Sequence, residues 1–365
     1  MSAVDPLLVE TATRVFADVA TFAAVEQAER DGWAPAMWDA ISETGLAWVS
    51  VPESAGGSGG TLADAVEIVR IAGRHAVPLP LAETGLLGGW LLAGAGLEIP
   101  DGPLTVAPGT ASDDLAVRDG RLYGTAHRVP WARAVEQIAV LVEGPEAPLV
   151  AQVAPSDARV VHAANLAGEP RDTLTFDGVA PRAISPAGAG TDATALRLRG
   201  ALARTAAMAG ALERLEALTL EYTATRRQFG KPVGTFPAVQ AHLVHAAQQS
   251  AIVNMALSAA VHAAERVSAR FEIAAAKLLA NQAATEATRH AHQAHGAMGM
   301  TREYPLHHFS RRLWAWRSEY GDERGWSRTL GDAVRAVGAD HLYPVIAGGS
   351  AVLDQLAATG PPSHT

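Results

Sequence analysis

The chain has 365 residues, of which 48% are hydrophobic and 18% are charged, a composition typical of globular proteins. Its formal net charge of −9 argues against nucleic acid as a main partner, and the lack of cysteine excludes disulfides, thiolate metal sites and a cysteine nucleophile. No charge-free apolar run of about 18 residues is present, and the amino terminus lacks the basic start of a signal peptide. We therefore expect a cytoplasmic protein without a membrane span.

The first hundred residues are expected to be mostly helical. In MWDAISETGLAWVSVPE, Trp38 and Ile41 follow helical spacing, and Gly45 is a plausible helix end. A glycine-rich loop at 54–60 is followed by helical periodicity, for which Thr61 is the expected N-cap.

From 104 to 190 the chain consists of short β-rich runs separated by glycine, proline and aspartate. The segment VRDGRLYG carries the Asp-Gly signal of a tight β-hairpin at Asp119 and Gly120. A small all-β domain is therefore expected between two helical regions.

From about 193 the chain is helical almost to its end. Leu212, Leu215 and Leu218 line one face of a long helix that should stop at QFGKP. The next helix has Thr235 as its expected cap and Pro237 in its first turn. Helices are expected over about 235–270, 272–294 and 310–320, with another beyond 326. The domains are thus an N-terminal helical domain at 1–103, a β domain at 104–190 and a helical bundle at 191–365.

Two motifs resemble catalytic or metal sites but are not expected to form them. GGSGG places Ser58 in a nucleophile-elbow pattern, but its helical surroundings favour a mobile glycine loop over a hydrolase site. Among His290, His292 and His295 only the last two share a helix face, and no carboxylate lies at a useful offset. No metal site is therefore expected.

Two helix ends are candidate ligand sites. Arg226 and Phe229 lie three residues apart, which suits a phosphate and a planar ring, although the spacing alone favours a helix-end arginine above a buried phenylalanine. Gln293 offers an amide, and Gly296 and Gly299 permit close backbone approach, or simply punctuate a helix end. The residues alone leave both alternatives open.

Three segments in order resemble the acyl-CoA dehydrogenase family. WDAISETGLAWVSVPESAGGSGGTLAD resembles its N-terminal signature, YTATRRQFGKPVGTFPAVQ its Y-x-x-x-R-x-x-F-G motif, and HQAHGAMGMTREYPLHHFSRR its Q-x-H-G-x-x-G-x-T-x-E-x-P stretch. The resemblance covers nearly the whole chain. It implies a mainly α fold with a central small β-barrel domain and a C-terminal four-helix bundle.

The family's activity is α,β-dehydrogenation of an acyl-CoA thioester with FAD held between subunits. A glutamate removes the α-proton while the flavin takes the β-hydride, and an electron-transfer flavoprotein is the usual acceptor. By position, Arg226 would meet the FAD pyrophosphate with Phe229 nearby. Gln293 and the backbone of Gly296 and Ala297 would hold the adenosine side.

The sequence departs from the family at the catalytic base. One base position falls on Tyr320, and the other falls on Gly200. Glu319, the remaining catalytic candidate, is one residue early, which rotates a helical side chain by about 100°. Pairing of Glu319 with Arg317, Arg311 or Arg312 on a surface or interface is therefore favoured over a role as the base.

Two further departures concern the flavin. The family's T-E-P-x-x-G-S-D segment survives at best as APGTASDD at 107–114, and Asp322 replaces a threonine that would touch FAD. This pattern resembles the non-catalytic subunit of heteromeric actinobacterial acyl-CoA dehydrogenases of the steroid side-chain type. We expect an FAD-sharing, base-lacking subunit that assembles with a homologous subunit or with itself. The alternative is a flavin-free structural subunit of the same fold.

Overall fold

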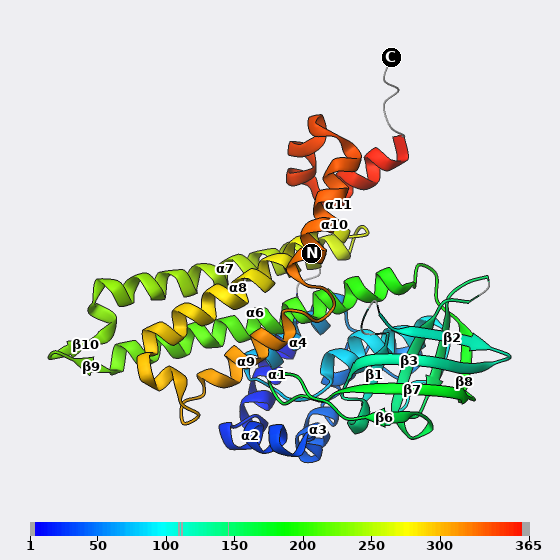
Figure 1. Ribbon diagram of the computed structural model, residues 1–365, viewed down its shortest axis with the longest axis horizontal. Coiled ribbons are helices and arrows are strands. Elements are labelled where there is room, and N and C mark those ends of the chain that lie inside the picture. Colours follow the sequence, from blue (N-terminus) through cyan, green and yellow to red (C-terminus); the bar gives the residue numbers. More distant parts are fainter. Residues whose placement is uncertain (1–3, 109, 111, 145, 360–365) are drawn as a thin grey trace. The chain divides into compact units, whose positions relative to one another are not determined.

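The structure is a computed structural model that describes residues 4–108, 110, 112–144 and 146–359 (Figure 1). The chain forms two compact units, one reaching to Ala203 and the other beginning at Arg204. Helices dominate both ends of the chain and strands occupy its middle, so the expected mainly α fold with a central β part is confirmed. None of the described helices combines the length and apolarity needed to cross a membrane.

The first unit begins with a series of helices. They are α1 (Pro6–Val19), α2 (Phe22–Asp31), α3 (Pro35–Ser42), α4 (Leu62–Arg74) and α5 (Trp90–Gly94), with 3₁₀ turns η1 (Leu46–Trp48) and η2 (Glu53–Ala55). Of these, α1, α3 and α4 contribute most to one apolar core, in which Phe16 and Ile41 are fully buried. Thr61 caps α4 as expected, in a reciprocal capping box with Asp64.

An eight-residue π-helix, η3 (Ala82–Gly89), precedes α5 and is buried throughout. Its glycines allow neighbouring backbone to approach closely. A Cβ at Gly85 would lie 2.2 Å from the carbonyl oxygen of Ala47, and one at Gly89 would lie 2.5 Å from the Val51 side chain. Side chains at these positions would push η3 away from the segment beside it.

The β part of the first unit consists of two four-stranded sheets. One has the order β1 (Leu104–Ala107), β4 (Gln137–Val142), β5 (Leu149–Val153), β8 (Ala183–Pro186), and the other β2 (Asp114–Arg118), β3 (Arg121–Pro130), β7 (Arg171–Val179), β6 (Arg159–Val161). Short 3₁₀ turns are η4 (Ala132–Ala134) and η5 (Pro155–Asp157). Only β1 and β4 pair in parallel among the described strands. A parallel bridge between Ala116 and Glu143 links the sheets, and side chains of both form one core, which gives the barrel-like closure.

The predicted hairpin at Asp119 and Gly120 is confirmed. Arg118 pairs with Arg121 across the turn, and the two turn residues have φ angles of 49° and 71°. Two positive φ angles are what a two-residue type I′ turn requires, and Asp-Gly tolerates them.

The second unit is helical. The long helix α6 (Ala193–Thr225) enters it from the first unit, and α7 (Pro237–Ala264), α8 (Arg270–His295), α9 (Leu306–Trp316), α10 (Glu323–Val337) and α11 (Leu342–Thr359) follow. The hairpin β9 (Arg227–Gln228) and β10 (Lys231–Pro232) and the 3₁₀ turns η6 (Val233–Thr235), η7 (Gly296–Met300) and η8 (Ala339–His341) connect them. Helices α7 and α8 pack along one another (Figure 1).

Several helix ends differ from expectation. Phe236, not Thr235, is the N-cap residue of α7, because the Thr235 hydroxyl donates to the carbonyl oxygen of Pro232 instead. The helix expected at 310–320 begins at Leu306 and ends at Trp316, and Tyr320 beyond it has a φ of 55°. That conformation is incompatible with a continuing right-handed helix.

Candidate functional site

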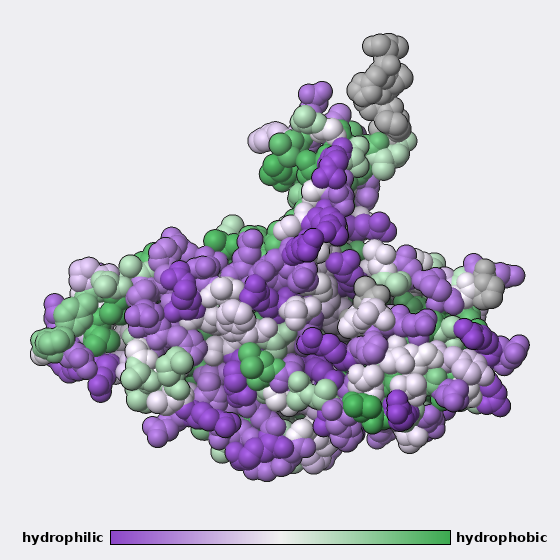
Figure 2. Space-filling view, viewed as in Figure 1, coloured by the Kyte–Doolittle hydropathy of each residue, from purple (hydrophilic) through white to green (hydrophobic). Residues whose placement is uncertain are grey.

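Arg226 and Phe229 lie where α6 gives way to the β9–β10 hairpin. Arg226 is exposed, and no hydrogen bond or ion pair of its guanidinium occurs within the described part of the chain. Phe229 is 92% exposed with a φ of 50°, and its ring meets Phe236 edge-on at 6.2 Å. The expectation of a buried phenylalanine under the arginine is therefore wrong. Figure 2 shows apolar surface at this hairpin, at the left of the view.

The ends of α6 and α8 are held together by an aromatic cluster. The Tyr222 ring stacks on His295 at 4.5 Å, Tyr304 meets both rings, and the Tyr304 hydroxyl donates to the carbonyl oxygen of Leu218. Arg226 follows Tyr222 by one helical turn, and Gln293 precedes His295 by two residues. The two predicted ligand segments thus belong to neighbouring helix ends of one rigid cluster.

The α8 end exposes the groups that the sequence indicated. Gln293, Gly296 and Ala297 are exposed, and a Cβ at Gly296 would meet nothing within 4 Å. Gly296 has a φ of 60° and closes α8 by donating to the carbonyl oxygens of Gln293 and His292. The Gln293 amide and an open stretch of backbone are therefore available at the end of α8. The neighbouring end of α6 carries Arg226, which has no ion-pair partner within the described part of the chain.

His295 is buried in this cluster. Its Nδ1 donates to the carbonyl oxygen of Ala291 at 2.8 Å, and burial lowers its pKa. Nε2 is then left as an acceptor with no hydrogen-bond partner among the described residues. Nδ1 of His292 is likewise buried with no hydrogen-bond partner among the described residues.

Glu319 lies in a buried ion pair. Its Oε2 accepts a hydrogen bond from Arg204 Nε at 2.6 Å, and the two side chains are only 9% and 5% exposed. Arg317, one of the expected partners, pairs with Glu323 instead. The sequence did not indicate Arg204, because 115 residues separate it from Glu319.

Lys277 on α8 contacts the end of α9, close to Glu319 in the sequence. Its side chain is fully buried, and Nζ donates to the carbonyl oxygens of Trp316 and Arg317 at 3.2 and 3.1 Å and to Asn281 Oδ1 at 2.5 Å. A cation at the C-terminal carbonyls of α9 complements the helix dipole. Burial lowers the pKa of Lys277 to about 7, while Glu319 opposes that shift and Arg204 adds to it. The sequence signal was its rarity, since it is one of two lysines in the chain.

No carboxylate occupies either position at which the resemblance places a base. Tyr320 is buried, and the Arg204 guanidinium lies 5.7 Å from the centre of its ring. Gly200 is buried within α6. Asp322, at the expected threonine, is the N-cap residue of α10, where its side chain accepts from the backbone of Gly325. The residues at these three positions therefore contribute to packing or to helix capping.

The segment 107–114 is only partly described, since Gly109 and Ala111 lie outside the described residues. Asp113 accepts from the backbone and hydroxyl of Thr110 and from the backbone of His127 at 2.9 Å. The turn between β1 and β2 is therefore tied to β3.

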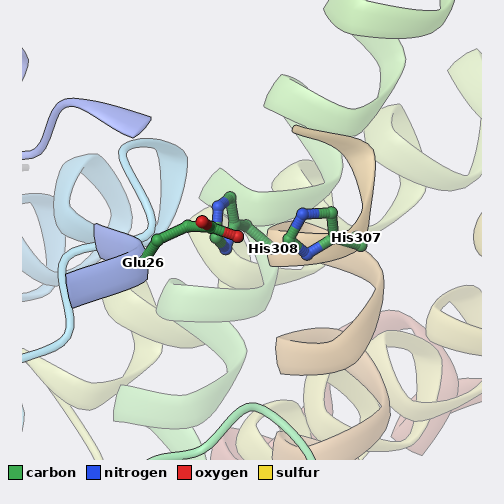
Figure 3. Close-up of side chains that lie close together, drawn as sticks. All are labelled: Glu26, His307 and His308. Atoms are coloured by element: carbon green, nitrogen blue, oxygen red, sulfur yellow. The ribbon is translucent and has the colours of Figure 1, made fainter. Parts of the chain in front are cut away.

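Histidines gather elsewhere in the second unit. His290 Nδ1 lies 2.7 Å from His242 Nδ1, and its ring stacks on His245, both on α7. At the start of α9, His307 and His308 have ring centres 4.2 Å apart (Figure 3). His307 Nε2 contacts the carbonyl oxygen of Arg302, and Nδ1 contacts an arginine nitrogen. Both ring nitrogens of His307 are therefore engaged in contacts within the protein.

The chain is similar in sequence to known proteins. Residues 189–322 match the acyl-CoA dehydrogenase C-terminal domain. The chain is 31% identical to acyl-CoA dehydrogenase FadE28 of Mycobacterium tuberculosis over 293 residues, which cover 74% of this chain and 84% of that protein.

Solved structures share the fold. A chain of the ChsE4–ChsE5 complex from Mycobacterium tuberculosis has a TM-score of 0.82 at 24% identity, covering 91% of this chain and 97% of that one. A chain of the Tcur3481–Tcur3483 steroid ACAD has a TM-score of 0.80 at 24% identity, covering 89% and 96%. From the sequence relationship and the shared fold, this chain belongs to the acyl-CoA dehydrogenase family.

Proposed function

We propose that this chain takes part in FAD-dependent α,β-dehydrogenation of an acyl-CoA thioester as the FAD-sharing, base-lacking subunit of a heteromeric complex. The observation that carries the proposal is the buried pair of Glu319 with Arg204. A carboxylate held by a guanidinium is stabilised in its charged form and is a weaker base. The nearest acid to the expected base position is thereby withdrawn from proton abstraction.

The residues at the ends of α6 and α8 fit an FAD molecule. Arg226 has no counter-ion among the residues that the structure describes and can offer its charge to a pyrophosphate, as arginine does in many phosphate sites. Gln293 and the open backbone at Gly296 and Ala297 suit the adenosine portion. The bound flavin would supply the hydride acceptor, and this chain's residues would position it.

A homologous subunit would supply the glutamate and most of the acyl pocket. The structural neighbours include a complex of two differently named subunits, ChsE4 and ChsE5, and a steroid ACAD. A steroid side-chain thioester is therefore the substrate class to test first, with an electron-transfer flavoprotein as the electron acceptor.

The first experiment compares the chain purified alone with the chain co-expressed with a homologous subunit that retains the glutamate. We expect little flavin absorbance and no dehydrogenation from the chain alone, and a yellow, active complex from the pair. A homo-oligomer that retains stoichiometric FAD and oxidises an acyl-CoA by itself would contradict the division of labour.

The second experiment tests Arg226 directly. Arg226→Ala should lower FAD retention by the complex, because the pyrophosphate loses its cation, whereas Arg328→Ala on α10 should not. Arg328 is a matched control, being likewise exposed and in the same unit. Equal FAD content in both variants would favour a flavin-free structural subunit.

A further inference from the structure

Arg199 lies in the second turn of α6, within the first unit. Its Nε donates a hydrogen bond to the carbonyl oxygen of Leu86 in η3 at 2.6 Å. Its guanidinium carbon lies 4.8 Å from the centre of the Trp90 ring at the start of α5. These two contacts fix the plane of the guanidinium against the wall made by η3 and α5.

This cation has no counter-ion in the part of the chain that the structure describes. Burial lowers the pKa of Arg199 to about 10, and no carboxylate offsets the shift. Arg171 and Arg204 are buried and each meet a glutamate, whereas Arg199 is partly exposed and meets no carboxylate among the described residues. Because a poorly solvated charge without a partner destabilises a fold, Arg199 requires an explanation beyond packing.

The protein contacts leave most of the guanidinium unused. Only Nε has a hydrogen-bond acceptor among the described residues, so the two Nη groups keep their donors. The cation–π contact with Trp90 holds the plane but supplies no negative charge. A neutral amide at this position could satisfy Leu86 equally well. The remaining pair of Nη groups has the fork shape that binds an oxyanion through two hydrogen bonds.

We propose that Arg199 binds a carboxylate on the acyl part of the substrate. The assignment rests on the proposed function in taking the substrate to be an acyl-CoA. Apart from Glu83 and Thr84, η3 and α5 consist of apolar residues and glycine, and Leu86, Leu87 and Leu91 are buried. A single cation on such a wall matches a singly charged carboxylate better than a multiply charged phosphate. Arg199 also directly precedes Gly200, one of the positions at which the family resemblance places a catalytic base.

The test measures binding of paired thioesters to the full chain, alone and in its complex. Glutaryl-, adipoyl- and pimeloyl-CoA are each compared with the monocarboxylic acyl-CoA of equal carbon number, and CoA and ADP serve as phosphate probes. We expect at least one dicarboxylic thioester to bind roughly tenfold more tightly than its uncharged match, as hydrogen bonds to charged groups allow. Arg199→Gln should abolish that preference and leave monocarboxylic binding unchanged.

Arg197→Gln is the matched control, since Arg197 is an exposed arginine on the same helix. It should retain the preference, and Arg199→Lys should retain part of it. Absence of any preference in the native protein would overturn the proposal. So would an equal weakening of CoA, ADP and all thioesters by Arg199→Gln, because the anion bound would then be a phosphate.

A second measurement does not depend on acyl-CoA binding. Free adipate or pimelate should raise the melting temperature of the native protein but not of Arg199→Gln, which separates failure of the anion site from failure of the proposed function. Arg199→Met should melt at the same temperature as the native protein or higher, because it removes an unpaired charge. A lower melting temperature together with unchanged thioester preference would show a purely structural arginine.

Discussion

The buried pair of Arg204 and Glu319 makes a quantitative prediction about stability. Removing one partner of a buried ion pair leaves an uncompensated charge and typically costs about 3–5 kcal/mol. Glu319→Gln should approach this range, because it leaves Arg204 beside Lys277, whose pKa Glu319 raises and Arg204 lowers. Arg204→Met should cost less, since the remaining carboxylate still has the Lys277 ammonium nearby.

Urea unfolding followed by circular dichroism gives the free energies for the two single variants and for the double variant Arg204→Met/Glu319→Gln. The double variant should be more stable than the sum of the single losses by about 1–3 kcal/mol, as expected for directly coupled residues. High salt should change little, because a buried pair is poorly screened. Additive losses, or a smaller loss for Glu319→Gln than for Arg204→Met, would refute the buried pair as the structure has it.

The pH dependence of stability should reflect the protonation of Lys277. Two glycine replacements should change stability in opposite directions. The folded pKa of Lys277 is about 7 against an ordinary 10.5, so the unfolded chain binds more protons between these values and the free energy of unfolding should rise with pH there. The contribution is at most about 1.4 kcal/mol per pH unit, and it should vanish from the pH profile of Lys277→Met. Gly124→Ala should lower stability by roughly 2–4 kcal/mol, because its φ is 113° and a Cβ would lie within bonding distance of the Asp114 carbonyl oxygen. Gly331→Ala within α10 should instead stabilise by about 0.5–1 kcal/mol, since a Cβ there meets nothing within 4 Å. Thermal melts of the two glycine variants check both signs, and a stable Gly124→Ala would contradict the β2–β3 register.

Local signals predicted much of the fold. The Asp119–Gly120 hairpin and the Thr61 cap follow from single residues whose backbone or hydrogen-bonding preference dominates their surroundings. Pro237 lies at the first position of α7 as expected. In each case the decisive interaction joins residues close together in the sequence.

The misassigned and missing elements depend on distant contacts. The π-helix η3 has no sequence signature, and its geometry depends on close approach to residues 47–51. Helix α11 changes direction at Gly349, where the Glu272 side chain accepts from the backbone and hydroxyl of Ser350. A helix cap supplied from a position 78 residues away cannot be found by periodicity.

In the candidate site, too, features set by nearby residues could be predicted from the sequence, whereas features set by distant contacts could not. Arg226 and Gln293 could be proposed from the sequence because their motifs are contiguous, and the structure exposes both side chains at neighbouring helix ends. The partner of Glu319 was missed because Arg204 lies on another helix. Lys277 was missed because its role, donating to carbonyl oxygens at the end of α9, requires the tertiary fold.

Charge compensation within the chain supports the proposed division of labour. Glu319, the acid nearest the expected base position, is neutralised internally by Arg204. Arg226 and Arg199 are cations without counter-ions among the described residues, and they lie where a cofactor phosphate and a substrate carboxylate are proposed. A subunit that performed its own proton abstraction would need the opposite pattern, an unpaired carboxylate in a water-poor pocket. A chain that keeps anion-binding groups and withdraws its acid is suited to binding ligands whose chemistry is completed by another subunit.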